Sequence, residues 1–217
     1  MQRSGCQWEM LPHDFPPYTT VYGYFQKWQR KGMIAENSRP NTPSTAPRFR
    51  TRGTLYCGER RFSIGEDQGK KGEVYGFDGG KKVKGRKRHI VVDSQGLLIG
   101  VLVTEANASE RLGAVVVLDE AAVELSKLEV IWVDQGYSGD NFAQAVRQVC
   151  GEQVRVEVIQ RHSKTFERLP KRWIVERTFG WLNRFRRLSK DYQLYTELSE
   201  AMIYGSLIRL MIKRMVS

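Results

Sequence analysis

Residues 89–103 read HIVVDSQGLLIGVLV, and this stretch decides the fold. Two runs rich in β-branched and aliphatic residues flank Asp93-Ser94-Gln95-Gly96, a group of residue types that favours a tight turn. The pattern predicts a β-hairpin.

Strands and helices alternate after this hairpin. Together with the antiparallel hairpin, the alternation predicts an α/β layered domain with a mixed sheet. The expected elements are a helix from about Glu110 to Leu125, a short buried strand at 129–134, a helix at 142–149, a strand at 154–159, a long helix from Pro170 to about Leu188, and a last helix at 199–215.

Two different segments precede the hairpin. In residues 1–32, apolar side chains from Val21 to Trp28 recur at helical spacing, and one helix cannot bury such a stripe alone. This helix either docks on the main domain or is the remnant of a larger helical domain. Residues 33–71 combine Pro, Ser and Thr with many Arg and have no clear period, so we expect an irregular basic segment before a main domain at 72–217.

The chain is strongly basic. Its 217 residues contain 35 Lys and Arg against 24 Asp and Glu, a formal charge of +11, so a polyanion is the expected partner. No run approaches eighteen apolar residues, and the first residues contain no apolar signal-peptide core, so we expect a cytoplasmic protein that does not enter a membrane.

The positive charges are clustered. Six of the ten residues at 81–90 are Lys or Arg, and residues 161–190 contain ten Lys or Arg against two acids. A nuclear-localisation-like run is the alternative interpretation of the first cluster. We expect DNA contacts from Lys81, Lys82, Lys84, Arg86, Lys87, Arg88, Arg172, Arg177, Arg187 and Lys190.

Two carboxylates are the candidate catalytic residues. Asp134 ends an apolar strand, at the edge where open α/β sheets collect ligands, although such an acid can also simply belong to the turn. Glu176 lies in an apolar helical segment beside a cationic stripe, where a salt-bridge role is the alternative. Phosphodiester chemistry needs carboxylates from different elements to hold Mg²⁺, so Asp134 and Glu176 are the expected metal ligands.

Three motifs carry a resemblance to a known family. The segments FDGGKKVKGRKRH at 77–89, VDQGY at 133–137 and RWIVERTFGWL at 172–182 resemble the DDE transposases of bacterial insertion sequences, in the insertion-sequence-five group with an insertion-sequence-four-like catalytic domain.

The resemblance implies a ribonuclease-H-like fold and DNA strand transfer that depends on Mg²⁺ or Mn²⁺. The implied substrate is double-stranded DNA at the terminal inverted repeats of the element, and a homodimer is a possible assembly. It further implies that Asp134 is the second catalytic carboxylate, that Glu176 is the third, and that Arg172 lies near them.

The first catalytic Asp of this family is missing. It belongs to a D-S-Q-S-V-K-T segment before the 77–89 motif, where this chain has RFSIGEDQ at 61–68. Back-translation shows that codons for this stretch, read one base later, can encode D-S-Q-S-V-K-T. We therefore hypothesise that residues of about 33–70 are translated out of frame.

The predicted function is a degenerate transposase copy with an N-terminal remnant at 1–32 and little or no strand-transfer activity. Asp67, Asp78 and Asp93 are weak candidates to replace the missing carboxylate. The alternatives are a catalytically inactive DNA-binding protein derived from a transposase and a basic RNA-associated structural protein.

Overall fold

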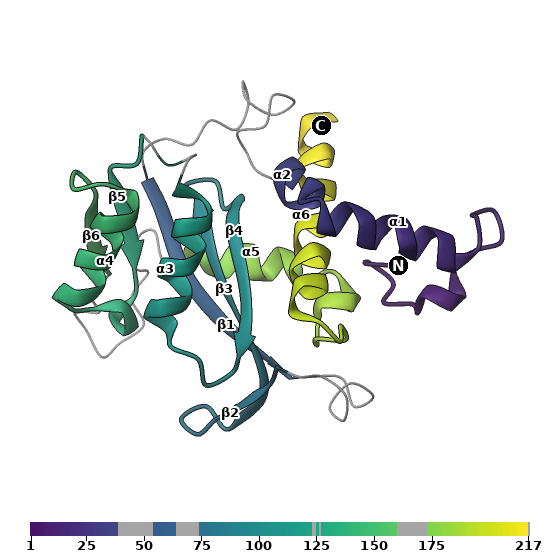
Figure 1. Cartoon of the computed structure of the whole chain (residues 1–217), viewed down its shortest axis with the longest axis horizontal. Helices are drawn as coiled ribbons and strands as arrows, with labels where there is room; N and C mark the ends of the chain where they lie inside the picture. Colours follow the sequence, from purple (N-terminus) through teal and green to yellow (C-terminus); the bar gives the residue numbers. More distant parts are fainter. Residues whose placement is uncertain (39–53, 64–73, 123–124, 126, 160–172, 217) are drawn as a thin grey trace.

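The computed structural model describes residues 1–38, 54–63, 74–122, 125, 127–159 and 173–216 (Figure 1). The strands are β1 (Thr54–Ser63), β2 (Gly76–Asp78), β3 (Val83–Asp93), β4 (Leu98–Glu105), β5 (Val130–Val133) and β6 (Arg155–Val158). The helical segments are η1 (Trp8–Met10), α1 (Tyr18–Arg30), α2 (Met33–Ser38), α3 (Glu110–Glu120), η3 (Gln135–Tyr137), α4 (Asp140–Cys150), α5 (Trp173–Leu182), η4 (Arg186–Leu188) and α6 (Thr196–Val216).

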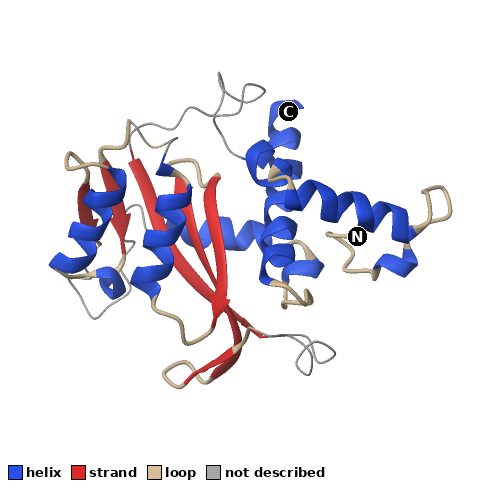
Figure 2. Cartoon of the chain, in the orientation of Figure 1, coloured by secondary structure: helices blue, strands red, loops and turns tan. Residues whose placement is uncertain are grey.

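The strands form one mixed sheet with β1 in its middle (Figure 2). β1 pairs antiparallel with β3 along its length and parallel with β5 at its start. β3 also pairs antiparallel with β4 and, at its own start, with β2, while β6 pairs parallel with β5. The predicted α/β class, a mixed sheet flanked by helices, is confirmed, and the arrangement is consistent with a ribonuclease-H-like fold.

Helices cover both faces of the sheet. Alternation along β1 sends Cys57 into the core under α3 and α4, and sends Tyr56 into the core under α5 and α6. Burial of apolar side chains on both faces therefore fixes the register of β1, because a slip by one residue would exchange the two sets.

The predicted hairpin is confirmed as β3 and β4. Its turn is stabilised by Asp93, which is 1% exposed and whose Oδ1 accepts hydrogen bonds from the backbone N–H groups of Gln95 and Leu97, both at 2.8 Å. Gly96 has φ +78°, a left-handed conformation that costs glycine little.

The N-terminal helices dock on the α5 and α6 side. Trp8, Phe25 and Ile34 are partly buried against the core on that face, which covers part of the apolar stripe of α1, although Trp28 stays 47% exposed. The docking is also anchored by the backbone, because the N–H groups of Arg186 and Arg187 donate to the carbonyls of Arg3 and Gln2.

The segment at 33–71 is not irregular throughout, which corrects the sequence-based expectation. Residues 33–38 form α2, and residues 54–63 form β1. Consecutive residues of β1 are covered from both faces, so Tyr56 and Cys57 are both buried and no simple alternation is visible in the sequence. The rest of this segment lies outside the described residues, and the reading-frame hypothesis stays a prediction.

The long helix predicted to reach Leu188 is shorter. α5 ends at Leu182, and the chain turns through Phe185, which has φ −97° and ψ 107°, into the short η4. The turn lets Phe185 and Leu188 pack into the same core as α6. Among the described helices, none has the length and apolar character to cross a membrane.

Candidate active site and nucleic-acid surface

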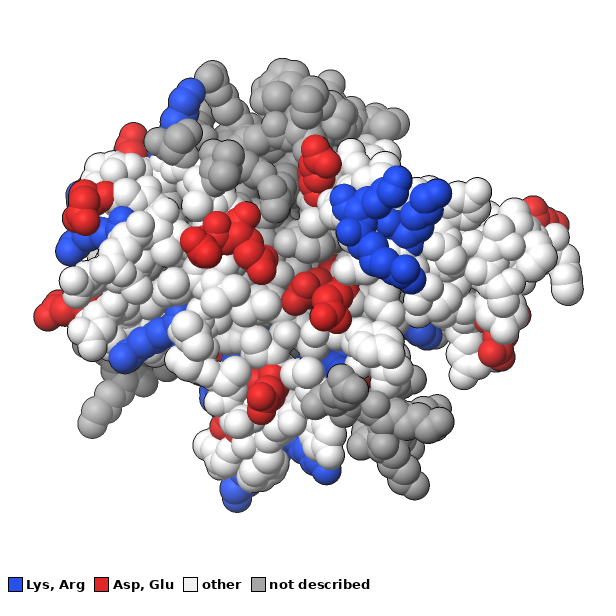
Figure 3. Space-filling view, in the orientation of Figure 1, with Lys and Arg blue, Asp and Glu red and all other residues white. Residues whose placement is uncertain are grey.

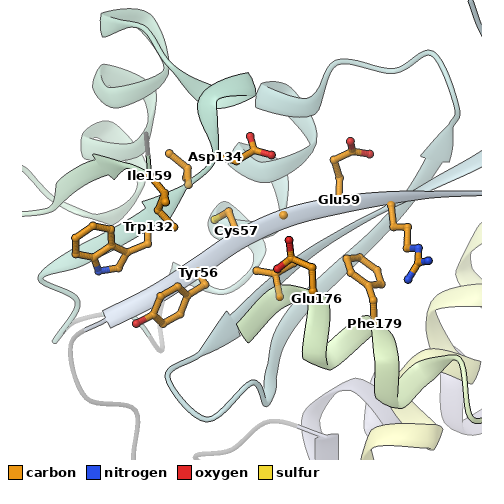
Figure 4. A pocket seen from close by; sticks show the side chains of 12 residues that line it. Tyr56, Cys57, Glu59, Trp132, Asp134, Ile159, Glu176 and Phe179 are labelled. Carbon is orange, nitrogen blue, oxygen red and sulfur yellow. The ribbon is translucent and has the colours of Figure 1, made fainter. Parts of the chain in front are cut away.

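A pocket of about 300 Å³ brings the two predicted carboxylates together (Figure 4). Asp134 and Glu176 both line it, although 42 positions separate them in the sequence. The other lining residues come mainly from β1, β5 and α5, and are Tyr56, Cys57, Gly58, Glu59, Arg60, Trp132, Val133, Ile159, Val175 and Phe179.

Asp134 is positioned by the end of β5. The apolar strand stops at Val133, and Asp134 caps η3 by accepting a hydrogen bond from the N–H of Gly136 at 2.9 Å through Oδ1. The same carboxylate therefore stabilises the turn and lines the pocket, and its catalytic role stays a prediction.

Glu176 projects from the first turn of α5. Its helix is held against β1 by apolar neighbours, with Phe179 buried in the core and Val175 partly buried beside it. The first turn is a favourable place for a carboxylate, because the unpaired N–H groups there carry partial positive charge.

Gly58 is the β1 residue that faces α5 inside the pocket. It lies two residues after Tyr56, on the same side of the strand, and an ideal Cβ at this position would lie 2.5 Å from Cγ1 of Val175. The close approach of α5 to β1 therefore depends on glycine here.

Glu59 also lines the pocket, and the sequence interpretation overlooked it. Strand alternation turns its side chain to the α3 face, where Arg61 donates to its Oε1 at 2.8 Å and to Oε1 of Glu110 at 2.9 Å. Burial and the nearby Glu110 raise the pKa of Glu59 to about 7, against the opposing effect of Arg61 and Lys87.

These donors do not fit a site in which three carboxylates hold a divalent metal. Asp134 and Glu176 line the pocket, but the third acidic lining residue, Glu59, is engaged by Arg61 on the α3 side of the sheet. Among the described residues, no three His, Cys, Asp or Glu side chains are grouped so that they could hold one metal ion.

The weak candidates for the missing carboxylate have structural roles instead. Asp93 is buried in the hairpin turn. Asp78 accepts hydrogen bonds from the N–H groups of Gly80 and Lys81 and forms an ion pair with Arg61. Asp67 lies outside the described residues.

Three of the expected DNA contacts are buried, which corrects that part of the prediction. Arg86, Lys87 and Arg88 are 1%, 2% and 1% exposed, because the middle of β3 lies between β1 and β4 with helices on both faces. Each of them donates to at least one backbone carbonyl, as Arg88 does to that of Leu188 and Lys87 to that of Ala108. Burial removes these three side chains from the surface that DNA could touch.

The other expected contacts lie at the surface in varying degree. Lys81, Lys82, Lys84 and Lys190 are exposed. Arg177 is partly buried between the rings of Trp173 and Trp181, at 4.2 and 4.9 Å from their centroids. Arg187 is partly buried over Tyr192, and Arg172 lies outside the described residues.

A further basic patch was missed by the sequence interpretation. Figure 3 shows Lys and Arg side chains gathered where the end of α1 meets α6, two elements that are in contact. The exposed cations of these elements are Lys27, Arg30, Lys31, Arg209 and Lys213. The helical spacing in α1 could have indicated the first three, but only the tertiary structure brings α6 beside them.

Comparisons with known proteins identify a family for this chain. The family described as "Transposase DDE domain" matches residues 43–211, and the family described as "Putative transposase of IS4/5 family" matches residues 1–37. The "Putative transposase for insertion sequence element IS402" of Burkholderia cepacia is 29% identical over 133 residues, which cover 58% of this chain and 60% of that protein.

A solved structure, the simian T-cell lymphotropic virus intasome in complex with PP2A regulatory subunit B56 gamma, aligns with a TM-score of 0.38 and 17% identity over 60% of this chain and 38% of that one. The family match extends over most of the sequence and includes both pocket carboxylates. The chain therefore belongs to the DDE transposase domain family.

Proposed function

We propose that this chain is a degenerate DNA transposase, which binds the terminal inverted repeats of an insertion sequence but has lost most of its strand-cleavage activity. The family typically uses a divalent metal, Mg²⁺ or Mn²⁺, and Asp134 and Glu176 are the residues of this chain that would lie beside such an ion. Cytoplasmic location and a homodimer remain part of the proposal.

One observation carries the proposal. Asp134 and Glu176 line a common pocket, while the β1 residues beside them are Gly58, which has no side chain, and Glu59, whose carboxylate is ion-paired with Arg61. Two carboxylates can supply some of the oxygen ligands for a divalent metal, but they are short of the ligand set that two-metal strand cleavage requires. The formal charge of +11 and the exposed lysines supply the attraction to the DNA backbone.

Binding and cleavage are tested separately on the same DNA. A labelled duplex that carries the terminal repeat of the element is compared with a scrambled duplex of equal length, by gel shift and then by denaturing gel in Mg²⁺ and in Mn²⁺. We expect preferential binding of the repeat and cleavage close to background.

The variants Asp134→Asn and Glu176→Gln identify the source of any remaining cleavage, with Asp140→Asn on the exposed start of α4 as the control. Robust cleavage that both pocket variants abolish would show an intact enzyme and overturn the degeneracy. Equal binding of repeat, scrambled DNA and RNA would favour the RNA-associated alternative.

A further inference from the structure

The start of β3 and the strand β2 form a two-stranded ribbon that extends beyond the rest of the sheet (Figure 1). We call residues 75–85 the β2 arm. In this arm Gly76 pairs with Gly85, Phe77 with Lys84, and Asp78 with Val83, so the arm is a short antiparallel hairpin. Only its base adjoins the described core, because β4 pairs with β3 from Arg86 onward.

The β2 arm is held in one conformation. Its turn is closed by Asp78, whose Oδ1 accepts hydrogen bonds from the N–H groups of Gly80 at 2.9 Å and Lys81 at 3.0 Å. The other carboxylate oxygen of Asp78 accepts a hydrogen bond from Nε of Arg61, which connects the turn to β1. At the base, Nε of Arg86 donates to the carbonyl of Val74 at 2.8 Å.

One face of the arm exposes aromatic rings. Phe77 is 58% exposed and Tyr75 is 40% exposed, and both lie on the side of Lys84, whose Nζ is 5.1 Å from the centroid of the Tyr75 ring. An exposed phenylalanine adds little to the stability of the fold. Its ring is instead available for contact with a partner.

The charge of the arm indicates the chemistry of its partner. Lys81, Lys82 and Lys84 are exposed, while the acid of the arm, Asp78, is already engaged by Arg61. The available charge is therefore positive and lies beside the aromatic face. Basic side chains interleaved with aromatic rings are typical of nucleic-acid surfaces, and the major groove of B-form DNA is wide enough to admit a two-stranded β-ribbon.

We propose that the β2 arm enters the major groove of duplex DNA, with Lys81, Lys82 and Lys84 on the flanking phosphates and Phe77 against the sugar and base edges. The proposal rests on the proposed function in that the chain binds DNA, and it adds where and how. Phe77 and Tyr75 become DNA-contacting residues, while the buried Arg86, Lys87 and Arg88 support the arm from its base.

The salt dependence of binding tests the lysines. A triple Lys81→Gln/Lys82→Gln/Lys84→Gln variant should lower the slope of log K against log salt by about 2.7, since each phosphate contact contributes about 0.9. The control is Lys127→Gln/Arg147→Gln/Arg155→Gln, which removes the same charge from exposed positions outside the arm and should retain most of the slope.

Phe77→Ala tests the groove contact. We expect affinity for duplex DNA to fall about tenfold at constant salt slope, as for truncation of a side chain central to an interface. The control is Phe15→Ala, at a phenylalanine that is 56% exposed and outside the arm, which should leave the affinity unchanged. Circular dichroism melts should match the unaltered chain, because neither ring is in the core.

Three outcomes would overturn the proposal. The first is an equal decrease of the salt slope in the arm variant and the control variant. The second is that Phe77→Ala binds DNA as well as the unaltered chain. The third is that Phe77→Ala changes the sedimenting mass, which would make this face a contact between copies of the chain. Absence of any salt-dependent DNA binding by the unaltered chain would instead refute the proposed function itself.

Discussion

Replacing Arg86 by methionine should destabilise the fold rather than weaken DNA binding selectively. The guanidinium is 1% exposed and donates to the carbonyls of Gln193 at 2.8 Å, Leu194 at 2.7 Å and Val74 at 2.8 Å. Its Nη1 also lies 3.5 Å from Oδ1 of Asp191, which is itself 1% exposed. The side chain thus fastens the loop before α6 and the base of the β2 arm to β3.

The expected cost follows from what remains behind. Arg86→Met strands the Asp191 carboxylate without its buried counterion, which typically costs about 3–5 kcal/mol, and leaves carbonyl oxygens that water cannot easily reach. Typical domains have about 5–15 kcal/mol of total stability, so the variant should lose roughly a fifth of it or more. Asp191→Asn in the same chain should recover part of the loss.

Urea unfolding followed by circular dichroism measures this cost, with Lys82→Met as the exposed control. We expect the control to unfold like the unaltered chain and to bind DNA more weakly. If Arg86→Met unfolded within about 1 kcal/mol of the unaltered chain and weakened DNA binding as much as Lys82→Met, the buried role assigned to Arg86 would be wrong.

Three smaller predictions concern the pocket and α3. Gly58→Ala should cost about 1–3 kcal/mol through overpacking against Val175, and adding Val175→Ala should reduce that cost, as judged by urea midpoints. Because the pKa of Glu59 is raised to about 7, the folded state holds a proton that the unfolded chain releases above about pH 4.5, so stability falls as pH rises from about 4.5 to 7. Glu59→Gln should therefore flatten this fall and gain roughly 1–3 kcal/mol above pH 7, measured by melts across pH. Ser109→Ala should cost about 1 kcal/mol, because the Ser109 hydroxyl caps α3 through the N–H of Leu112, and an unchanged melting temperature would argue against that cap.

The sequence predicts the fold best where one local signal decides the structure. The hairpin at 89–103 combines two apolar runs with turn residues, and β5 is a short apolar run between polar neighbours, so both are found where expected. β1 could not be found in this way. Its partner strands on both sides are distant in sequence. The run Arg60-Arg61-Phe62 also interrupts any alternation of polar and apolar residues along the strand.

In the candidate site too, the sequence predicts residues that a local signal marks and misses those that depend on tertiary structure. Asp134 could be predicted because it ends an apolar strand, and Glu176 because it interrupts an apolar helix. The burial of Arg86, Lys87 and Arg88 could not be predicted, since a run of cations ordinarily indicates a solvated surface and only the tertiary structure shows the carbonyls to which they donate.

If the first catalytic carboxylate is absent, as we propose, the pleat of β1 explains why Glu59 does not take its place. Successive side chains of a strand point to opposite faces, so Glu59, one residue beyond Gly58, faces Arg61 and Glu110 instead of α5. A carboxylate at position 58 would face Glu176, but its Cβ would collide with Val175, which has closed over the glycine. Restoring a third carboxylate on this side therefore requires two coordinated changes, a new acid on β1 and a smaller side chain on α5. On the proposed function, a single substitution at Glu59 or Gly58 is therefore not expected to complete a three-carboxylate site.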